Sequence, residues 1–287
     1  MTGLTGMTTA RAVLRLAGEE ARDFLQDLVT NDVSRARGDT AVWAALLTPQ
    51  GKYLSDFFVI EDGRDPDVPA LLVDAPLAHG GELAKRLALY RLRRKIEITA
   101  AGLDAALLWG DAPPQTPPQI PPQTPAGALL VRDPRDPALG WRLYAPDPAA
   151  ALAATGAAPA PEGAYDALRI AVRAPEAGAE LGPDSYILEA GFERLHGVDF
   201  RKGCYVGQEI VARMKHKTEL RRRLMRVAVT GAPPAPGAEI LTEAGRVAGQ
   251  LGIVSGGEGL AMLRVDRASG PLTAGEARLA VIEDPAP

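Results

Sequence analysis

A single cysteine constrains what this chain can fold into. Cys204 is the only cysteine among 287 residues, so no internal disulfide can staple a small, loop-rich fold. The chain is instead long enough to bury a sizeable hydrophobic core, as one large domain or as two to three small ones. One thiol also cannot hold a metal cluster without ligands from elsewhere. If Cys204 has a chemical role, it acts as a single thiolate or as one ligand shared with a partner.

The residues around Cys204 favour such a role. The thiol lies in the segment Lys202-Gly203-Cys204-Tyr205-Val206-Gly207-Gln208-Glu209. Nearby positive charge favours the thiolate form, and three cations are close in sequence, namely Arg201, Lys202 and Arg213. The alternative is a buried cysteine that packs as a small apolar side chain. The two glycines support the functional interpretation, because they allow the backbone to turn or to approach a ligand closely.

The first hundred residues alternate between strand-like and helix-like patterns. Apolar residues recur at helical spacing over residues 19–28 and 77–92. Strand patterns occur at residues 11–17, 42–47, 53–60, 70–73 and 95–99. Proline and glycine predict a turn over residues 48–52. This order predicts an α+β unit with helices on one face of a sheet.

Two proline-rich segments divide the rest of the chain. Residues 112–125 repeat Pro-Pro-Gln, a composition that favours extended chain, and we expect a solvated insertion rather than a docking motif for SH3-like domains. A second α+β unit is expected from residue 128, and prolines at 231–237 mark another boundary. Beyond it, short runs predict a small antiparallel barrel or sandwich, at residues 239–242, 246–254, 260–265 and 277–282. The expected domains are residues 1–228, with an insertion at 112–126, and residues 229–287.

Charge is unevenly distributed along the chain. The net charge is −4, which argues against a general polyanion binder. Nine Lys or Arg nevertheless lie in residues 201–226 and six in residues 85–95. Such clusters indicate a local anion site, although solvated surfaces also collect basic residues. Folate carboxylates or RNA phosphates would supply the negative charge, and the scarcity of aromatic residues around the clusters disfavours RNA.

The sequence also suggests a location. No stretch approaches the roughly 18 apolar residues of a membrane span, and the N-terminus lacks the basic start and apolar core of a signal peptide. One cysteine fits a reducing compartment. We therefore expect a cytoplasmic protein without a membrane partner.

The segment Lys202–Glu209 resembles the KGCYVGQE signature of the YgfZ family, which comprises folate-binding proteins that support iron–sulfur enzymes. Residues 24–33, 47–52 and 165–175 resemble the same family, so the resemblance covers most of residues 8–265. This family is similar in turn to the T-protein, the aminomethyltransferase of the glycine cleavage system. The resemblance implies an α+β, T-protein-like fold, with two α+β units around a central folate opening and a C-terminal antiparallel β-barrel.

Three positions depart from the related families. The aminomethyltransferases carry acids after their first glycine turn and after a Leu-Arg-Leu segment, whereas this chain has Ser55 and Ala171 there. Neither residue can act as a carboxylate beside the reacting folate nitrogens. Arg11 stands where an aromatic residue lines the opening in the wider family. The resemblance therefore implies folate binding without glycine-cleavage chemistry.

The site residues follow from the same resemblance. Cys204 would be the functional thiol, and the charge of Lys202 would favour its thiolate. No metal site is expected in the chain itself. Other residues would shape the loop or contact tetrahydrofolate, including its polyglutamylated form: Asn31, Asp32, Tyr165, Lys202, Gly203, Tyr205, Gly207, Gln208, Glu209 and Arg213.

The resemblance implies an accessory protein for iron–sulfur cluster assembly or repair, including in tRNA-modifying enzymes, rather than a catalyst. Its partners would be folate and iron–sulfur client enzymes or cluster-assembly proteins, without direct contact to nucleic acid. Two alternatives stay open. A folate-dependent one-carbon transferase would turn over an aminomethyl donor, and a tRNA-binding protein would bind tRNA in a salt-sensitive way without folate.

Overall fold

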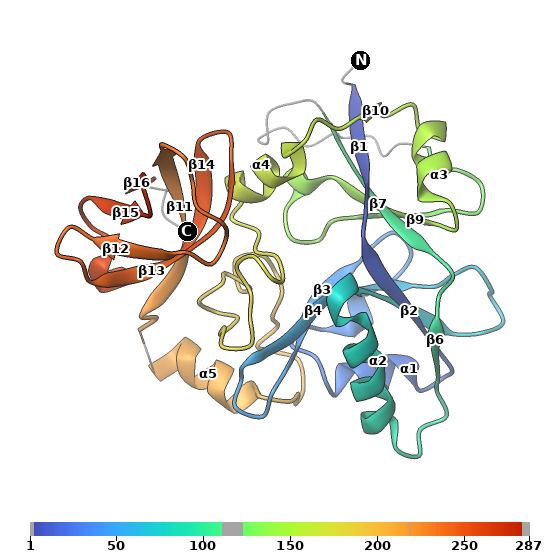
Figure 1. Ribbon diagram of the computed structural model, residues 1–287. Coiled ribbons are helices and arrows are strands. Elements are labelled where there is room, and N and C mark those ends of the chain that lie inside the picture. Colours follow the sequence, from blue (N-terminus) through green and yellow to red (C-terminus); the bar gives the residue numbers. More distant parts are fainter. Residues whose placement is uncertain (1–2, 111–122, 218, 283–287) are drawn as a thin grey trace. The chain divides into compact units, whose positions relative to one another are not determined.

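The structure, a computed structural model, describes residues 3–110, 123–217 and 219–282. These residues form two compact units, which we describe separately. The first unit comprises Met1–Leu47, Ser55–Ala160 and His196–Val206, and the second comprises Thr48–Leu54, Pro161–Leu195 and Gly207–Pro287. Figure 1 follows the chain through both of them. Residues 112–122 of the Pro-Pro-Gln tract lie outside the described residues.

One five-stranded sheet of the first unit has the order β3-β4-β5-β2-β6. Its strands are β2 (Arg11–Ala17), β3 (Val42–Leu47), β4 (Tyr53–Glu61), β5 (Ala70–Pro76) and β6 (Glu97–Ala100). Helices α1 (Ala21–Gln26) and α2 (Leu77–Arg91) accompany this sheet. Helix α2 packs on β2 closely enough to require glycine, because a Cβ on Gly80 would lie 2.2 Å from the Cβ of Ala12.

A second five-stranded sheet of the first unit has the order β10-β1-β7-β9-β8. Its strands are β1 (Leu4–Thr9), β7 (Asp104–Gly110), β8 (Leu129–Arg132), β9 (Trp141–Ala145) and β10 (Ala158–Pro159). Helix α3 (Pro148–Ala154) covers a core that includes Leu108, Trp141 and Leu143. Strand β1 pairs along its whole length with β7, from Leu4 opposite Gly110 to Thr9 opposite Ala105. Successive strands β1 and β2 therefore belong to different sheets.

The second unit contains a closed six-stranded barrel with the order β11-β14-β13-β12-β15-β16. Its strands are β11 (Arg222–Thr230), β12 (Glu239–Thr242), β13 (Val247–Ser255), β14 (Glu258–Arg264), β15 (Leu272–Ala274) and β16 (Ala277–Val281). Fully buried Val227, Ile240, Leu251 and Leu263 contribute to the barrel core. Helices α4 (Ala164–Ala171) and α5 (Gln208–Lys217) precede the barrel. The barrel begins at Arg222, upstream of residue 229 where the sequence places a boundary.

The closed barrel confirms the expected C-terminal antiparallel β-barrel and excludes the sandwich alternative. Strands β1, β7, β11 and β15 are among those that the sequence patterns missed. In β1, Thr and Gly occupy four of the six positions, so no apolar alternation marks it. Within the described ranges, no helix is both long and apolar enough to cross a membrane.

Candidate functional site

The loop that carries Cys204 is fastened to the segment after helix α1. The amide group of Asn31 donates to the carbonyl oxygens of His196, at 2.6 Å, and Trp43, at 2.8 Å. The Thr30 hydroxyl donates to the carbonyl oxygen of Gly197 at 2.7 Å. Both Asn31 and Thr30 are buried. Both side-chain N–H groups of Asn31 are thus used within the protein, one of them to hold the loop, and they are not available to a ligand.

Asp199 fixes the next turn of the loop. Its Oδ1 accepts hydrogen bonds from the main-chain N–H groups of Arg201, at 2.7 Å, and Lys202, at 3.2 Å. Its Oδ2 accepts from the guanidinium of Arg35. The main-chain N–H of Asp199 donates to the Thr30 carbonyl at 3.0 Å. Asp199 was not predicted as a functional residue, although an Asp shortly before a glycine-containing turn is a common sign of an Asx turn.

Lys202 is the third anchor. Its ammonium donates to the carbonyl oxygens of Gln26 and Val29, both at 2.5 Å. Burial lowers the pKa of Lys202 from 10.5 to about 8, and the charges of Asp32, Asp27 and Asp199 act in the opposite direction. Lys202 therefore ties the loop to the end of helix α1, a role that the sequence did not predict.

Tyr205 and Asp32 are also engaged within the first unit. The Lys202 ammonium lies 5.3 Å from the centre of the Tyr205 ring, within range of a cation–π contact. Burial raises the pKa of Tyr205 to about 12. Asp32 accepts hydrogen bonds from the main-chain N–H of Ser34 and from the side chain of Gln26, both at 3.1 Å. Although burial opposes the change, these contacts and the charge of Arg35 lower the pKa of Asp32.

Cys204 itself is exposed, so the interpretation of a buried apolar cysteine is wrong. The two glycines beside it differ. Gly207 has φ 84°, in the region that favours glycine. Gly203 does not, and a Cβ added to it would meet no atom within 4 Å. The structure of the protein itself therefore gives no steric reason for glycine at position 203. The geometry presents an accessible thiol on a firmly held loop.

The remaining residues of the signature lie in the second unit. Gln208 and Glu209 begin helix α5, and exposed Arg213 lies one turn beyond Glu209 on the same face. The predicted turn at residues 48–52 packs against this helix, because a Cβ on Gly51 would lie 2.8 Å from the Cβ of Ile210. Gly51 has φ 73°, so both its conformation and its packing require glycine.

Lys52 completes this turn and was not predicted as a functional residue. Its ammonium donates to the carbonyl oxygen of Asp184 at 2.7 Å and lies 4.0 Å from the centre of the Tyr186 ring. Nearby in sequence, Glu189 pairs with Arg222 at 3.2 Å, and burial raises the pKa of Glu189. Tyr165, expected at the folate opening, lies half-buried on helix α4.

Two of the positions that depart from the related families, Ser55 and Arg11, make contacts within the protein. Ser55 is 3 % exposed and its hydroxyl lies 3.1 Å from His79 Nδ1. The neighbouring Asp56 accepts a hydrogen bond from the Trp43 indole at 2.8 Å. Arg11 pairs with fully buried Asp74 at 2.5 Å. In this geometry, neither Asp56 nor Asp74 replaces the missing acid as an accessible group.

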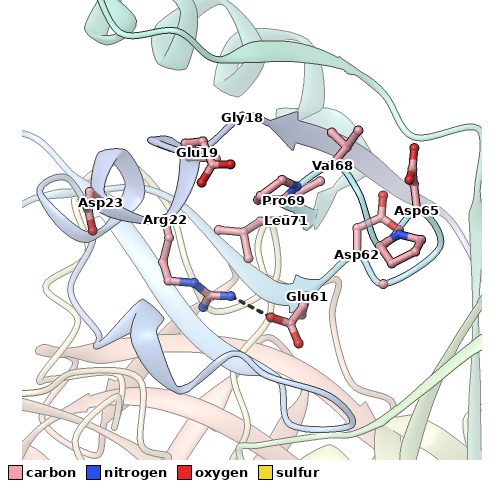
Figure 2. Close-up of a pocket in the computed structure, with 14 residues that line it drawn as sticks. Gly18, Glu19, Arg22, Asp23, Glu61, Asp62, Asp65, Val68, Pro69 and Leu71 are labelled. Carbon is pink, nitrogen blue, oxygen red and sulfur yellow. Dashed lines mark hydrogen bonds and ion pairs between the residues drawn. The ribbon is translucent and has the colours of Figure 1, made fainter.

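A cavity in the first unit has the wrong charge for folate. It has a volume of about 490 Å³ and lies between the start of α1 and the β4–β5 turn. Figure 2 shows one lining cation, Arg22, which pairs with Glu61 at 3.1 Å. Four further carboxylates line the cavity, those of Glu19, Asp23, Asp62 and Asp65. The carboxylates of a folate would be repelled here. Across the described residues, no three His, Cys, Asp or Glu side chains are grouped to hold a metal ion.

Comparisons with known proteins agree with this fold. The profile of the family described as "CAF17, C-terminal beta-barrel domain" matches residues 221–286, which coincide with the barrel. Among solved structures, the glycine cleavage system aminomethyltransferase T from Bartonella henselae matches with a TM-score of 0.74 and 14 % identity. That match covers 99 % of this chain and 85 % of the other. At this identity the likeness shows the fold alone.

Curated relatives identify the family more closely. The human mitochondrial iron–sulfur cluster assembly factor IBA57 is 34 % identical over 279 residues, which are 91 % of this chain and 78 % of the relative. The mouse protein of the same name is 32 % identical, with the same coverage. The Neurospora crassa homologue is 30 % identical over 78 % of this chain. That relative is longer, and the match covers only 53 % of its length.

These relatives refine the resemblance and correct one prediction. The likeness to the YgfZ family is correct at the level of the wider family, but the relatives are IBA57 proteins. The predicted cytoplasmic location is wrong, because these relatives are named as mitochondrial. One of its grounds, the single cysteine, indicates a reducing environment and cannot distinguish one reducing compartment from another. By its identity and coverage, the chain belongs to the IBA57 family of iron–sulfur cluster assembly factors.

Proposed function

We propose that this protein binds tetrahydrofolate and serves the assembly or repair of iron–sulfur clusters, including those of tRNA-modifying enzymes. In this proposal Cys204 is the thiol that meets the cluster or a partner protein. The names of the curated relatives support the cluster-assembly role. The aminomethyltransferase-like fold supports folate by analogy only.

The observation that carries the proposal is an exposed thiol on a fastened loop. Asn31, Asp199 and Lys202 hold the residues before Cys204, whereas the thiol remains accessible. Iron–sulfur clusters are usually held by several thiolates, and this chain has one cysteine. A cluster would therefore be cargo that is held jointly with a partner, which supplies the other ligands. Because the loop that carries Cys204 is already held in place, less conformational entropy is lost when that complex forms.

Folate fits some of the expected residues better than others. Exposed Arg213 on helix α5 and half-buried Tyr165 on helix α4 remain suitable for an anionic, aromatic ligand. The donors of Asn31 and the ammonium of Lys202 are already used within the protein. Tetrahydrofolate, when bound, carries one-carbon units. This chain places buried Ser55 and half-buried Ala171 where the transferases have acids, which supports binding without one-carbon transfer.

The test separates folate binding from the role of the thiol. Tetrahydrofolate is titrated calorimetrically into the wild-type protein and into Cys204→Ala, and both are assayed for methylenetetrahydrofolate formation with the aminomethyl carrier protein. Cells that lack the protein are then complemented with each form, and an iron–sulfur enzyme is assayed. We expect equal folate binding, no turnover, and loss of iron–sulfur activity with Cys204→Ala only.

Val206→Ala is the matched control, because it changes a neighbouring half-buried side chain and leaves the thiol in place. Full rescue by Cys204→Ala would refute the role of the thiol. Turnover at the rate of an authentic T-protein would favour the transferase alternative. Tight, salt-sensitive tRNA binding without folate binding would favour the RNA-binding alternative.

A further inference from the structure

The turn after helix α2 presents two leucines to solvent. Leu89 is 76 % exposed and Leu92 is 84 % exposed, although leucine is among the residues most often buried. Leu92 also has φ 50°, a conformation that residues other than glycine rarely adopt and that costs stability. An exposed apolar side chain in an unfavourable backbone conformation indicates that something other than the core benefits from it.

The backbone around Leu92 is firmly held. The main-chain N–H of Arg94 donates to the Arg91 carbonyl at 3.0 Å, and the Arg91 guanidinium donates to the Ile96 carbonyl at 3.0 Å. The main-chain N–H of Lys95 donates to Glu20 Oε2 at 2.7 Å. Leu92 is therefore not exposed because the turn is loose, since contacts on both sides determine its path.

Positive charge surrounds the two leucines. Lys85 is exposed one helical turn before Leu89 and on the same face, and Arg93 is exposed directly after Leu92. Two other cations are balanced locally, since Arg86 pairs with Glu82 and Arg94 pairs with Asp27. Residues 85–95 include no acid, so Lys85 and Arg93 contribute to a surplus of positive charge. A hollow beside Leu92 is lined by Glu20, Leu92, Arg93 and Arg94.

We propose that this surface, formed by Lys85, Leu89, Leu92 and Arg93, docks an acidic segment of a protein partner. A large apolar side chain of that segment packs against Leu89 and Leu92, and its carboxylates pair with Lys85 and Arg93. An anionic membrane surface has the same charge and also takes up leucines. A fluid bilayer, however, has no fixed binding site, so it gives no advantage to a single side chain that is held in an unfavourable backbone conformation. The proposal does not depend on folate binding or on Cys204.

A displayed peptide library tests the surface directly. Random peptides on phage are selected on the full-length protein, and the selected peptides are synthesised. Their affinities are measured for the wild type, for Leu89→Ser/Leu92→Gly and for Leu77→Ser. Leu77 is a matched control, since it is 60 % exposed on the same helix but about 18 Å from Leu89 along the axis.

We expect selected peptides with acidic residues around a large apolar one. They should bind the wild type and Leu77→Ser equally and the double variant about tenfold more weakly or worse, because two apolar contacts are lost. The urea midpoint of Leu92→Gly should equal or exceed that of the wild type, since glycine adopts positive φ readily. Peptides without acids, equal binding to the double variant, or a lower midpoint would each overturn the proposal. So would vesicles with phosphatidylglycerol that bind the wild type and not the double variant.

Discussion

Replacing Lys202 by methionine tests how the thiol-bearing loop is held. The variant keeps a long apolar side chain but removes the ammonium that donates to the carbonyl oxygens of Gln26 and Val29. A buried acceptor that loses its partner costs about 1–3 kcal/mol. Water can reach part of this half-buried site, so we expect a loss in the free energy of unfolding of about 1–3 kcal/mol in total for the two carbonyls.

The loss should depend on pH. The pKa of Lys202 is lowered from 10.5 to about 8 in the folded protein. Between these values the unfolded chain binds a proton that the folded chain does not, so the stability of the wild type rises with pH. Each unit of pKa difference corresponds to about 1.4 kcal/mol, and partial exposure reduces the full effect to about 1–2 kcal/mol. The neutral amine still donates to both carbonyls. The deficit of Lys202→Met should therefore be larger at pH 9.5 than at pH 7.

The assay is urea unfolding of both proteins at pH 7, 8, 9 and 9.5, followed by fluorescence. At each pH, the free energy of unfolding of the variant is subtracted from that of the wild type. To first order, this difference removes the contributions of other titrating groups. Lys85→Met, which changes an exposed lysine, is the control for the loss of a lysine side chain. A Lys202→Met deficit that stays constant or shrinks between pH 7 and pH 9.5 would refute the reasoning.

Three further predictions concern other parts of the chain. Asp199→Ala should lower the free energy of unfolding by about 2–4 kcal/mol in urea titrations, because two N–H groups and Arg35 lose their acceptor. Asp184→Ala, the control, removes a fully exposed carboxylate and should leave the free energy of unfolding almost unchanged. Gly51→Ala should lower the melting temperature by about 3–8 °C. Adding Ile210→Ala to the same chain should recover part of this loss; no recovery would show that the close packing of the two residues is unimportant. Replacing residues 113–124 by a short Gly/Ser linker should change the melting temperature by no more than about 1 °C; a larger loss would show that the tract packs on the protein.

The sequence predicted most elements of the fold because their patterns are local. Strands β2 and β3 begin and end where the apolar patterns do, at residues 11–17 and 42–47. Strand β1 could not be found in this way, since its place depends on pairing with β7, about a hundred residues later. The barrel boundary was also misjudged, because the prolines at 231–237 follow the first barrel strand rather than precede it.

The candidate site was predicted in part. The exposure of Cys204 agrees with the functional interpretation that the two glycines favoured, and the need for glycine at position 207 follows from local backbone rules. The structural use of Asn31 and Lys202 could not be inferred from sequence. Asn31 holds a main-chain carbonyl 165 residues away and Lys202 holds one 176 residues away. Because these long-range hydrogen bonds go to main-chain carbonyls, the residues that accept them can have any side chain, and the sequence shows no pattern there.

The position of strand β1 affects how the protein is made. Strand β1 has its hydrogen-bonding partner β7 at residues 104–110, about a hundred residues later in the chain, whereas β2 belongs to a sheet that is complete by Ala100. At roughly 5–20 residues per second, β1 waits about 5–20 s with both edges unpaired. An unpaired strand can associate with other chains, and the Thr and Gly residues that hid β1 from pattern analysis make it poorly suited to such association. The low apolar content of β1 thus limits its association with other chains until β7 is available.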